Sequence, residues 1–188
     1  MKYDFKTVVN RRHTDSVKWN VQDNELPMSI ADMDFKTAPE IILAMQEKLN
    51  LGAFGYEEAE EDYFNAVSNW YQLEHGANAD PTWMIFVTGV VPAISSIIRR
   101  ISHIGDNVLV QEPVYNIFYN SIENNGRHVL SSDLSYHDGK YEIDWQDLEN
   151  KLANPLTTVM LFCNPHNPAG IVWSNSEVER IAALCQKY

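Results

Sequence analysis

Apolar residues follow two different periods along this chain. Short apolar runs, the pattern of strands buried in a sheet, occupy residues 83–89, 107–113, 127–132 and 157–163. Apolar positions at helical spacing predict helices over residues 40–50, 57–74, 90–102, 114–126, 144–153 and 174–188. Because strands alternate with helices in the C-terminal part, we expect a three-layer α/β/α fold, with helices on both faces of a mostly parallel sheet.

Residues at the helix boundaries support these predictions. Gly52 and Gly126 stand at the ends of two predicted helices, where glycine commonly stops a helix. Pro92 falls in a first helical turn, where proline loses no hydrogen bond. Asp144 is the expected N-cap of its helix. The N-terminal part lacks such a pattern, and we expect residues 24–35, NELPMSIADMDF, to form an extended connection.

Composition narrows the class of protein. With 188 residues, 45% hydrophobic content and 5 tryptophans, the chain is suited to a folded domain with a core. A formal net charge of −12 argues against partners such as nucleic acid or an anionic membrane surface. The sequence has no apolar run long enough to span a membrane, and MKYDFKTVVNRR lacks the apolar core of a signal peptide. Cys163 and Cys185 form no disulfide framework, and Cys163 is expected to be a buried free thiol. We therefore expect a soluble, reduced, cytoplasmic protein.

Candidate chemistry lies at the carboxyl ends of the predicted strands, where open parallel sheets bind ligands. The first strand ends in TGVVP, and the unpaired N–H groups of Val90 and Val91 suit a phosphate. The motif matches neither the dinucleotide fingerprint nor the P-loop. The alternative interpretation is an ordinary turn in which Gly89 relieves backbone strain.

Two further strand ends carry side chains that suit a flat polar ring. In QEPVY, Tyr115 is placed to stack on such a ring or to pack on the core. In CNPHNPAG, the following prolines hold Asn164 and Asn167 in non-helical positions. Asparagine amides both donate and accept hydrogen bonds, so they suit a ring substituent. A simple Asx turn would need one Asn-Pro pair, and the doubling favours function.

The sequence lacks the motifs of several other catalytic classes. The histidines show no metal-ligand spacing, so no metal site is expected. No GxSxG motif is present, and neither cysteine lies in a known nucleophile motif. The acidic residues 57–62 are expected to be the solvated start of a helix.

Taken together, the motifs resemble a known family over essentially the whole chain. They are, in order, LPMSIADMDF, FGY, TGVVPAI, QEPVYNIF, GKYEIDWQDLE and CNPHNPAG. This order resembles the pyridoxal-phosphate (PLP) enzymes of aminotransferase fold type I, and more narrowly the cystathionine β-lyase (C–S lyase) branch of MalY/PatB type. ADMDF together with CNPHNP is specific to that branch.

The resemblance implies a PLP site built from particular residues. The backbone at Val90 and Val91 would hold the cofactor phosphate, and Tyr115 would stack on its ring. Asn167 would hydrogen-bond the phenolic oxygen of the ring and lie close to the substrate carboxylate. Tyr56 would reach the phosphate of a neighbouring subunit's cofactor, which implies a homodimer.

The resemblance also assigns supporting parts of the chain. Ala31 would border the substrate pocket, and Asn164 would set the turn that presents Asn167. Residues 1–45 would contribute to a small domain, and residues 46–188 would form the N-terminal part of the large PLP-binding domain. Many members have a second tyrosine where this chain has Asn116 and an arginine where it has Ile171, differences that bear on substrate preference.

The implied reaction is β-elimination of a cystathionine- or cysteine-like amino acid to thiol, pyruvate and ammonia. A lysine removes the α-proton, and the cofactor ring stabilises the resulting negative charge. In the family this lysine lies beyond the position of Tyr188, so we expect the fold to be incomplete at its C-terminus. No catalytic residue is then expected within this chain, which would be inactive alone. The lysines present match no family motif and are expected to be solvated: Lys2, Lys6, Lys18, Lys36, Lys48, Lys140, Lys151 and Lys187.

Three alternatives remain at this point. An aminotransferase of the same fold would share the strand-end residues and differ after proton abstraction. A truncated chain that serves for dimerisation or regulation would not catalyse a reaction. A nucleotide-binding α/β domain would bind phosphate at TGVV without binding an aromatic cofactor.

Overall fold

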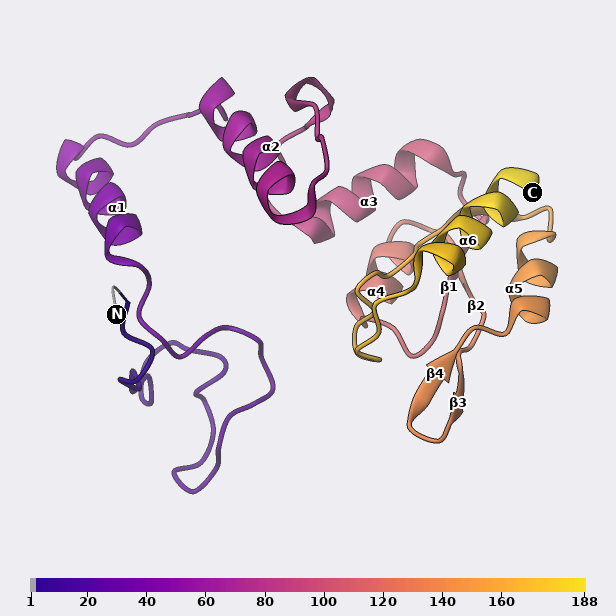
Figure 1. The fold of residues 1–188 in the computed structure, drawn as a ribbon, viewed down its shortest axis with the longest axis horizontal. Coiled ribbons are helices and arrows are strands. Elements are labelled where there is room, and N and C mark those ends of the chain that lie inside the picture. The colour runs from indigo at the N-terminus through magenta and orange to yellow at the C-terminus, as the bar shows by residue number, and fades with distance from the viewer. Residues whose placement is uncertain (1–2) are drawn as a thin grey trace. The chain divides into compact units, whose positions relative to one another are not determined.

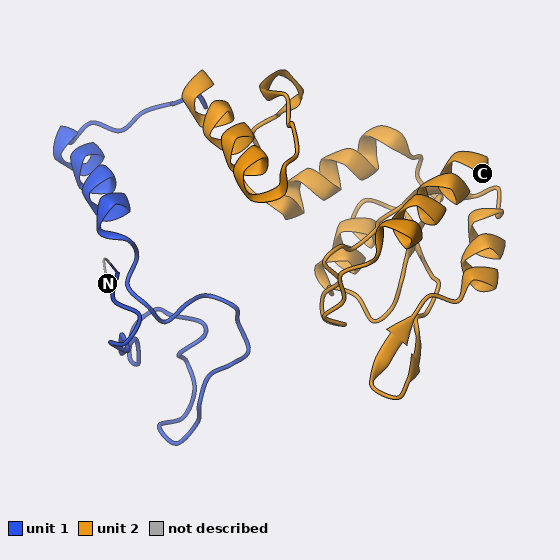
Figure 2. Ribbon diagram, viewed as in Figure 1, with its two compact units in different colours: residues 1–60 blue, residues 61–188 orange. Residues whose placement is uncertain are grey.

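A computed structural model describes residues 3–188 of the chain. The contacts divide it into two compact units, Met1–Glu60 and Glu61–Tyr188 (Figure 2). The expected domains, residues 1–45 and 46–188, stay a prediction. Lys2 lies outside the described residues.

The first unit combines an irregular segment with one helix. Helix α1 (Pro39–Leu51) has a proline at its start and ends at Gly52, whose φ of 68° is left-handed. The Gly52 N–H donates to the Leu49 carbonyl at 3.1 Å. Both the helix and its glycine stop confirm the prediction from sequence.

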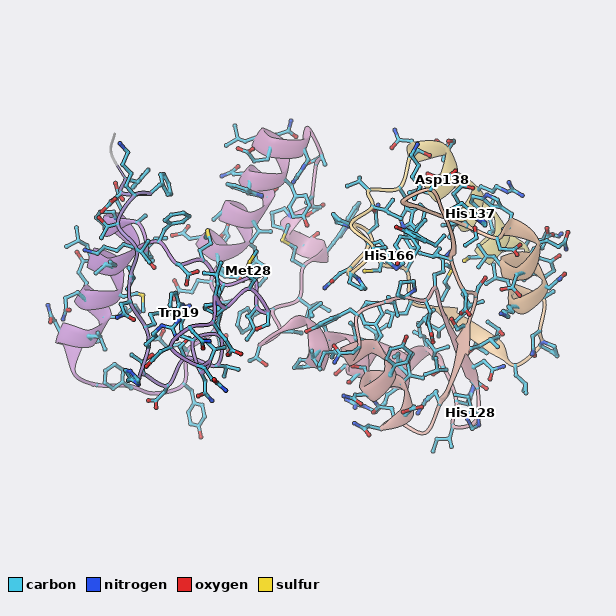
Figure 3. The ribbon with its side chains drawn as sticks, turned by 90° about the horizontal axis from the view of Figure 1, so that it is seen from below. Trp19, Met28, His128, His137, Asp138 and His166 are labelled. Atoms are coloured by element: carbon cyan, nitrogen blue, oxygen red, sulfur yellow. The ribbon has the colours of Figure 1, made fainter. Side chains whose placement is uncertain are left out.

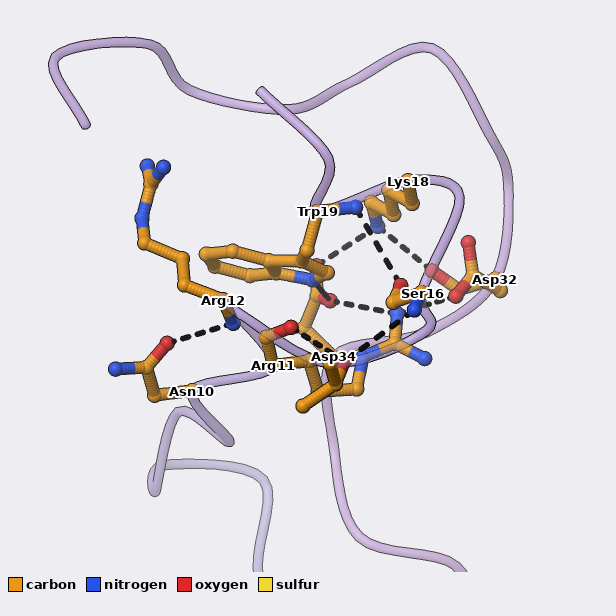
Figure 4. Close-up of polar contacts among 9 residues, drawn as sticks. Asn10, Arg11, Arg12, Ser16, Lys18, Trp19, Asp32 and Asp34 are labelled. Atoms are coloured by element: carbon orange, nitrogen blue, oxygen red, sulfur yellow. Dashed lines mark hydrogen bonds and ion pairs between the residues drawn. The ribbon is translucent and has the colours of Figure 1, made fainter. Parts of the chain in front are cut away.

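The irregular segment is organised around the Asp34 carboxylate (Figure 4). Lys18 Nζ lies 2.8 Å from Asp34 Oδ2 and 2.7 Å from the Asp32 carbonyl, and Trp19 Nε1 donates to Asp34 Oδ1 at 2.7 Å. Lys18 is only 7% exposed, so the prediction that it is solvated is wrong. The carboxylate and the carbonyl replace the water that a solvated ammonium group would bind.

The second unit holds the sheet (Figure 1). In chain order it contains α2 (Glu61–His75), η1 (Pro81–Trp83), α3 (Val90–Ile101), β1 (Asn107–Val110), α4 (Ile117–Glu123), β2 (His128–Ser131), β3 (Ser135–His137), β4 (Lys140–Glu142), α5 (Trp145–Leu152), β5 (Thr157–Met160) and α6 (Asn175–Lys187). The strands β2, β1 and β5 form a parallel sheet in that order, with β1 at its centre. This arrangement confirms the predicted alternation over residues 90–188.

Two apolar clusters lie on opposite faces of β1. Val108 and Val110 pack in one cluster with side chains of α3 and α4, including Ile98 and Ile122. Leu109 packs in the other cluster with side chains of α5 and α6. Alternate residues of a strand point to opposite faces, so the short apolar run of β1 is buried on both sides. The predicted three-layer α/β/α architecture is confirmed.

The prediction of a strand over residues 83–89 is wrong. Asp80 accepts a hydrogen bond from the Thr82 N–H at 2.8 Å, and the short helix η1 forms there. The apolar residues that follow have no ladder partner within residues 3–188, and Ile85 is 87% exposed. A strand requires a hydrogen-bonded neighbour, which a single-strand pattern in the sequence does not reveal.

Sequence patterning also missed the hairpin formed by β3 and β4. Its turn is Asp138-Gly139, with φ values of 50° and 82°. Two successive positive φ values are typical of the tight turn that Asp-Gly favours. The rings of Tyr136 and Tyr141 lie across the hairpin with centroids 4.7 Å apart. Helix α2 also begins at Glu61, four residues later than predicted.

Candidate functional site

The N-terminus of helix α3 follows directly on the segment TGVVP. Gly89 is the N-cap residue, and no side chain among residues 3–188 caps the helix there. The first N–H groups of an α-helix lack acceptors within the helix, which leaves those of Val90 and Val91 available. Val90 is 62% exposed and Val91 is 38% exposed, so a ligand has access to this helix end. Free N–H groups and the helix dipole together favour an anion.

Tyr115 lies in the segment between β1 and α4. Its ring packs edge-on against Phe118, with centroids 5.9 Å apart and an interplanar angle of 79°. Phe118 belongs to the core and is 8% exposed, whereas Tyr115 is 36% exposed. The tyrosine therefore rests on the core and still presents part of its ring to solvent, which is compatible with stacking.

The two asparagines of CNPHNPAG have different surroundings. Asn164 Oδ1 accepts a hydrogen bond from the Trp173 N–H at 3.3 Å, a contact that spans the loop. The side-chain amide of Asn167 is exposed and has no hydrogen-bonding partner within residues 3–188. Its backbone N–H donates to Cys163 Sγ at 3.3 Å. Asn164 thus shapes the turn, while the Asn167 amide remains available to a ligand. The Asn164–Pro165 and Asn167–Pro168 peptide bonds are both cis.

The loops that carry Tyr115 and Asn167 lie side by side. Val114 and Pro168 form an antiparallel backbone bridge, which joins the residue before Tyr115 to the residue after Asn167. Val114 also packs in one apolar cluster with Ile94 of α3, one turn beyond Val90. The structure therefore joins the loops of Tyr115 and Asn167, and one of these loops shares an apolar cluster with the second turn of α3.

Tyr56 and Ala31 belong to the first unit. Both are exposed, and the side chain of Tyr56 is completely open to solvent. Their part in a site with residues of the second unit stays a prediction.

Reasoning from the sequence missed His166, which stands between the two Asn-Pro pairs. Its side chain is 2% exposed, unlike those of His128 and His137 (Figure 3). His166 Nε2 lies 3.0 Å from the Pro113 carbonyl oxygen. Its ring meets Trp173 edge-on, with centroids 5.7 Å apart. A histidine enclosed by turn residues was the only signal in the sequence, and periodicity does not assign it to the interior.

Cys163 differs from its expected state. It is a free thiol as predicted, but it is half-buried and not fully buried. Its sulfur accepts from the Asn167 N–H and approaches the Pro165 carbonyl at 3.4 Å. The apolar run ends at this residue, so its sulfur lies at the base of the turn and not in the core.

One tyrosine near the site has a perturbed pKa. Burial raises the pKa of Tyr119 to about 12, and the Glu112 carboxylate, which accepts its hydrogen bond, adds to the shift. The phenol therefore keeps its proton and orients the carboxylate of the residue before Pro113.

Comparison with known proteins assigns the chain to a family. The family model for aminotransferase class I and II matches residues 23–188. The cystathionine beta-lyase PatB of Bacillus subtilis is 41% identical over 98% of the chain, which covers 49% of that protein. Protein MalY of Escherichia coli is 35% identical over 99% of the chain and 50% of its own length. The chain thus spans about half the length of the curated relatives it matches.

Solved structures agree with this result. Cystalysin from Treponema denticola, a structure that contains PLP, matches 100% of the chain and 50% of its own chain with a TM-score of 0.91 and 35% identity. A PLP-bound C–S lyase from Staphylococcus hominis matches 100% of the chain and 49% of its own chain with a TM-score of 0.88 and 28% identity. The match of a single family model to most of the chain, with the strand-end geometry described above, shows that the chain belongs to the class I and II aminotransferase family.

Proposed function

We propose that the protein to which this chain belongs is a PLP-dependent carbon–sulfur β-lyase that acts on cystathionine-like or cysteine-like amino acids. The observation that carries the proposal is the Val114–Pro168 bridge, which joins the loop of Tyr115 to the loop of Asn167. The relatives named cystathionine beta-lyase and C–S lyase support the reaction class.

The residues of this site fit PLP in three ways. The free N–H groups of Val90 and Val91 at the helix N-terminus suit the phosphate. The exposed part of the Tyr115 ring suits a flat heteroaromatic ring. The unpartnered Asn167 amide can donate to the phenolic oxygen of that ring and approach the substrate carboxylate. When bound, PLP stabilises negative charge at the substrate α-carbon.

In the proposed site, the residues of this chain bind the cofactor and orient its ring. Val90 and Val91 anchor the cofactor at one end, Tyr115 fixes the plane of its ring, and Asn167 fixes its rotation within that plane. Asn164 holds the turn that presents Asn167. Ala31, within ADMDF, borders the substrate.

We propose that the lysine that moves the α-proton is supplied by sequence C-terminal to Tyr188. Several lysines of the chain are already paired with carboxylates: Lys18 with Asp34, Lys48 with Glu57, Lys151 with Asp147 and Lys187 with Glu149. The length of the relatives, about twice that of the chain, supports this assignment.

The proposal includes a homodimer and a cytoplasmic location. The open side chain of Tyr56 is available to a neighbouring subunit, where it would contact the cofactor phosphate. The free thiols of Cys163 and Cys185 are typical of a reducing compartment. None of the helices within residues 3–188 is long and apolar enough to cross a membrane.

The test is incubation of the full-length protein and PLP with cystathionine, without added keto acid. Formation of pyruvate and free thiol in equal amounts is the expected result. An aminotransferase, a second candidate favoured by the tyrosine aminotransferase of Bos taurus at 27% identity, would instead require a keto acid. Turnover that appears only with a keto acid would reject the lyase, and absence of PLP binding would reject both.

A further inference from the structure

We propose that His166 is a positioning residue that sets the spacing between Tyr115 and Asn167. The inference rests on the proposed function and deepens it, because these two residues would hold the cofactor ring. Its basis is a hydrogen bond between the two loops, from the buried imidazole next to Asn167 to the carbonyl of Pro113, two residues before Tyr115.

The His166 backbone closes its own loop. Its N–H donates to the Ile171 carbonyl at 2.7 Å, and its carbonyl accepts from the Gly170 N–H at 2.7 Å. Residues 166 and 171 thus form an antiparallel bridge around the second Asn-Pro pair. A residue held at both backbone groups has little freedom, so its side chain has a fixed direction.

The imidazole extends this loop to its neighbour. A carbonyl oxygen only accepts hydrogen bonds, so the contact between Nε2 and the Pro113 carbonyl requires a proton on Nε2. Nδ1 is buried and has no partner within residues 3–188. Among the described residues, the Nε2–H group is therefore the ring's only polar link, and it is directed at the loop that carries Tyr115.

Trp173 fixes the ring from the other side. It is 4% exposed and meets His166 edge-on at an interplanar angle of 84°. Its Nε1 donates to the Cys163 carbonyl at 3.2 Å, and its N–H donates to Asn164. The imidazole is thus held between the base of its own loop and Pro113, and it fixes one loop relative to the other.

The test compares two substitutions in the full-length protein. His166→Gln places an amide N–H near the position of Nε2, whereas His166→Phe keeps a ring against Trp173 and removes the donor. His166→Phe removes the donor to the Pro113 carbonyl and with it the link between the loops, so it is expected to raise the dissociation constant of PLP about tenfold or more. His166→Gln is expected to stay within about threefold of the wild type.

The circular dichroism of bound PLP reports the orientation of its ring. This band is expected to change in His166→Phe and to return to the wild-type form in His166→Gln. Asp144→Ala is the matched control, because the Asp144 carboxylate accepts hydrogen bonds from the N–H groups of Gln146 and Asp147 in its own helix α5. It is expected to lower the melting temperature while it leaves the PLP dissociation constant and the band unchanged. Wild-type PLP binding in His166→Phe would overturn the inference, as would failure of His166→Gln to restore binding.

Two measurements do not depend on the cofactor. Imidazole nitrogen spectra of the wild type are expected to show the Nε2–H tautomer of His166, and an Nδ1–H tautomer would contradict the inference. Amide hydrogen exchange over residues 164–171 is expected to be faster in His166→Phe than in His166→Gln. If the wild type bound no PLP, the proposed function would be rejected. The two cofactor-independent measurements would still test the link between the loops.

Discussion

At the scale of single residues, the exposed side chains of the candidate site are the ones that strand-end motifs indicated. Tyr115 rests on buried Phe118 and remains 36% exposed, and the Asn167 amide is available. Such residues are recognisable because the sequence places an aromatic ring and a doubled Asn-Pro motif at the ends of predicted strands. His166 was missed because its role depends on a contact with Pro113, 53 residues away in the sequence.

Tyr115 gives a direct test of ring stacking. Tyr115→Phe keeps the ring and is expected to leave PLP affinity close to that of the wild type. Tyr115→Ala removes the aromatic contact, which is worth about 0.5–1.5 kcal/mol, so PLP should bind roughly two- to tenfold more weakly. Titration of the apo protein by cofactor absorbance checks this. Equal loss of affinity in both variants would argue against stacking.

Asp34 gives a test of pH dependence. Hydrogen bonds from Lys18 and then from Trp19 hold the pKa of Asp34 below its usual value. A lowered native pKa means that its stabilising contribution is complete above the unfolded pKa of about 3.9 and is lost as pH falls through the native value. The indole N–H resonance of Trp19 should therefore titrate below about pH 3.9. The titration should be absent in Asp34→Asn, and a midpoint at or above that pH would contradict the assignment.

At the scale of elements, the prediction worked where the signals were local. The N-cap Asp144 accepts hydrogen bonds from the N–H groups of Gln146 and Asp147, as its position predicted. Ser174 and Glu177 form a reciprocal capping box at the start of α6. Both devices act within one turn of helix, so neighbouring residues suffice to specify them.

The Asp144 cap can be tested by substitution. Asp144→Ala should lower the free energy of unfolding by about 1 kcal/mol, because two N–H groups of α5 lose their acceptor. Asp144→Asn retains a side-chain oxygen and should cost less. Urea unfolding followed by circular dichroism measures both values. If the two variants were equally destabilised, the carboxylate charge and not the cap would be responsible.

The strand predicted over residues 83–89 was not found, and it shows what the pattern of a single element cannot predict. Its apolar, β-branched composition is correct for a strand, yet the residues pair with no strand among those described. Pairing is a property of two segments, and the pattern of one segment does not contain it. The hairpin β3–β4 was missed although its Asp-Gly turn is a local signal.

At the scale of the whole molecule, we propose that the chain supplies a scaffold and part of a site. We expect the 188-residue chain, purified alone, to form no pyruvate from cystathionine, because the lysine needed for proton transfer is proposed to lie beyond it. The full-length protein, assayed in parallel, should form pyruvate and thiol. Turnover by the chain alone would contradict the assignment of the lysine.

The shared site predicted for the dimer can be tested by mixing inactive subunits. A Tyr56→Ala subunit retains Asn167, and an Asn167→Ala subunit retains Tyr56, so a hybrid dimer would contain one intact site. Random reassociation of equal amounts should restore roughly a quarter of wild-type activity. No recovery, with hybrid dimers verified by native mass spectrometry, would place Tyr56 outside the neighbour's site.

The sequence by itself determined the α/β alternation, most helix boundaries, the family resemblance, and the residue types at the strand ends. These follow from periodicity, caps and turns, which act over a few neighbouring residues. Only the tertiary structure decided that β1 lies between β2 and β5, that Lys18 is buried against Asp34, and that His166 joins the loops of Tyr115 and Asn167. Each of these is a contact between segments distant along the chain, and its energy depends on packing that no local pattern encodes.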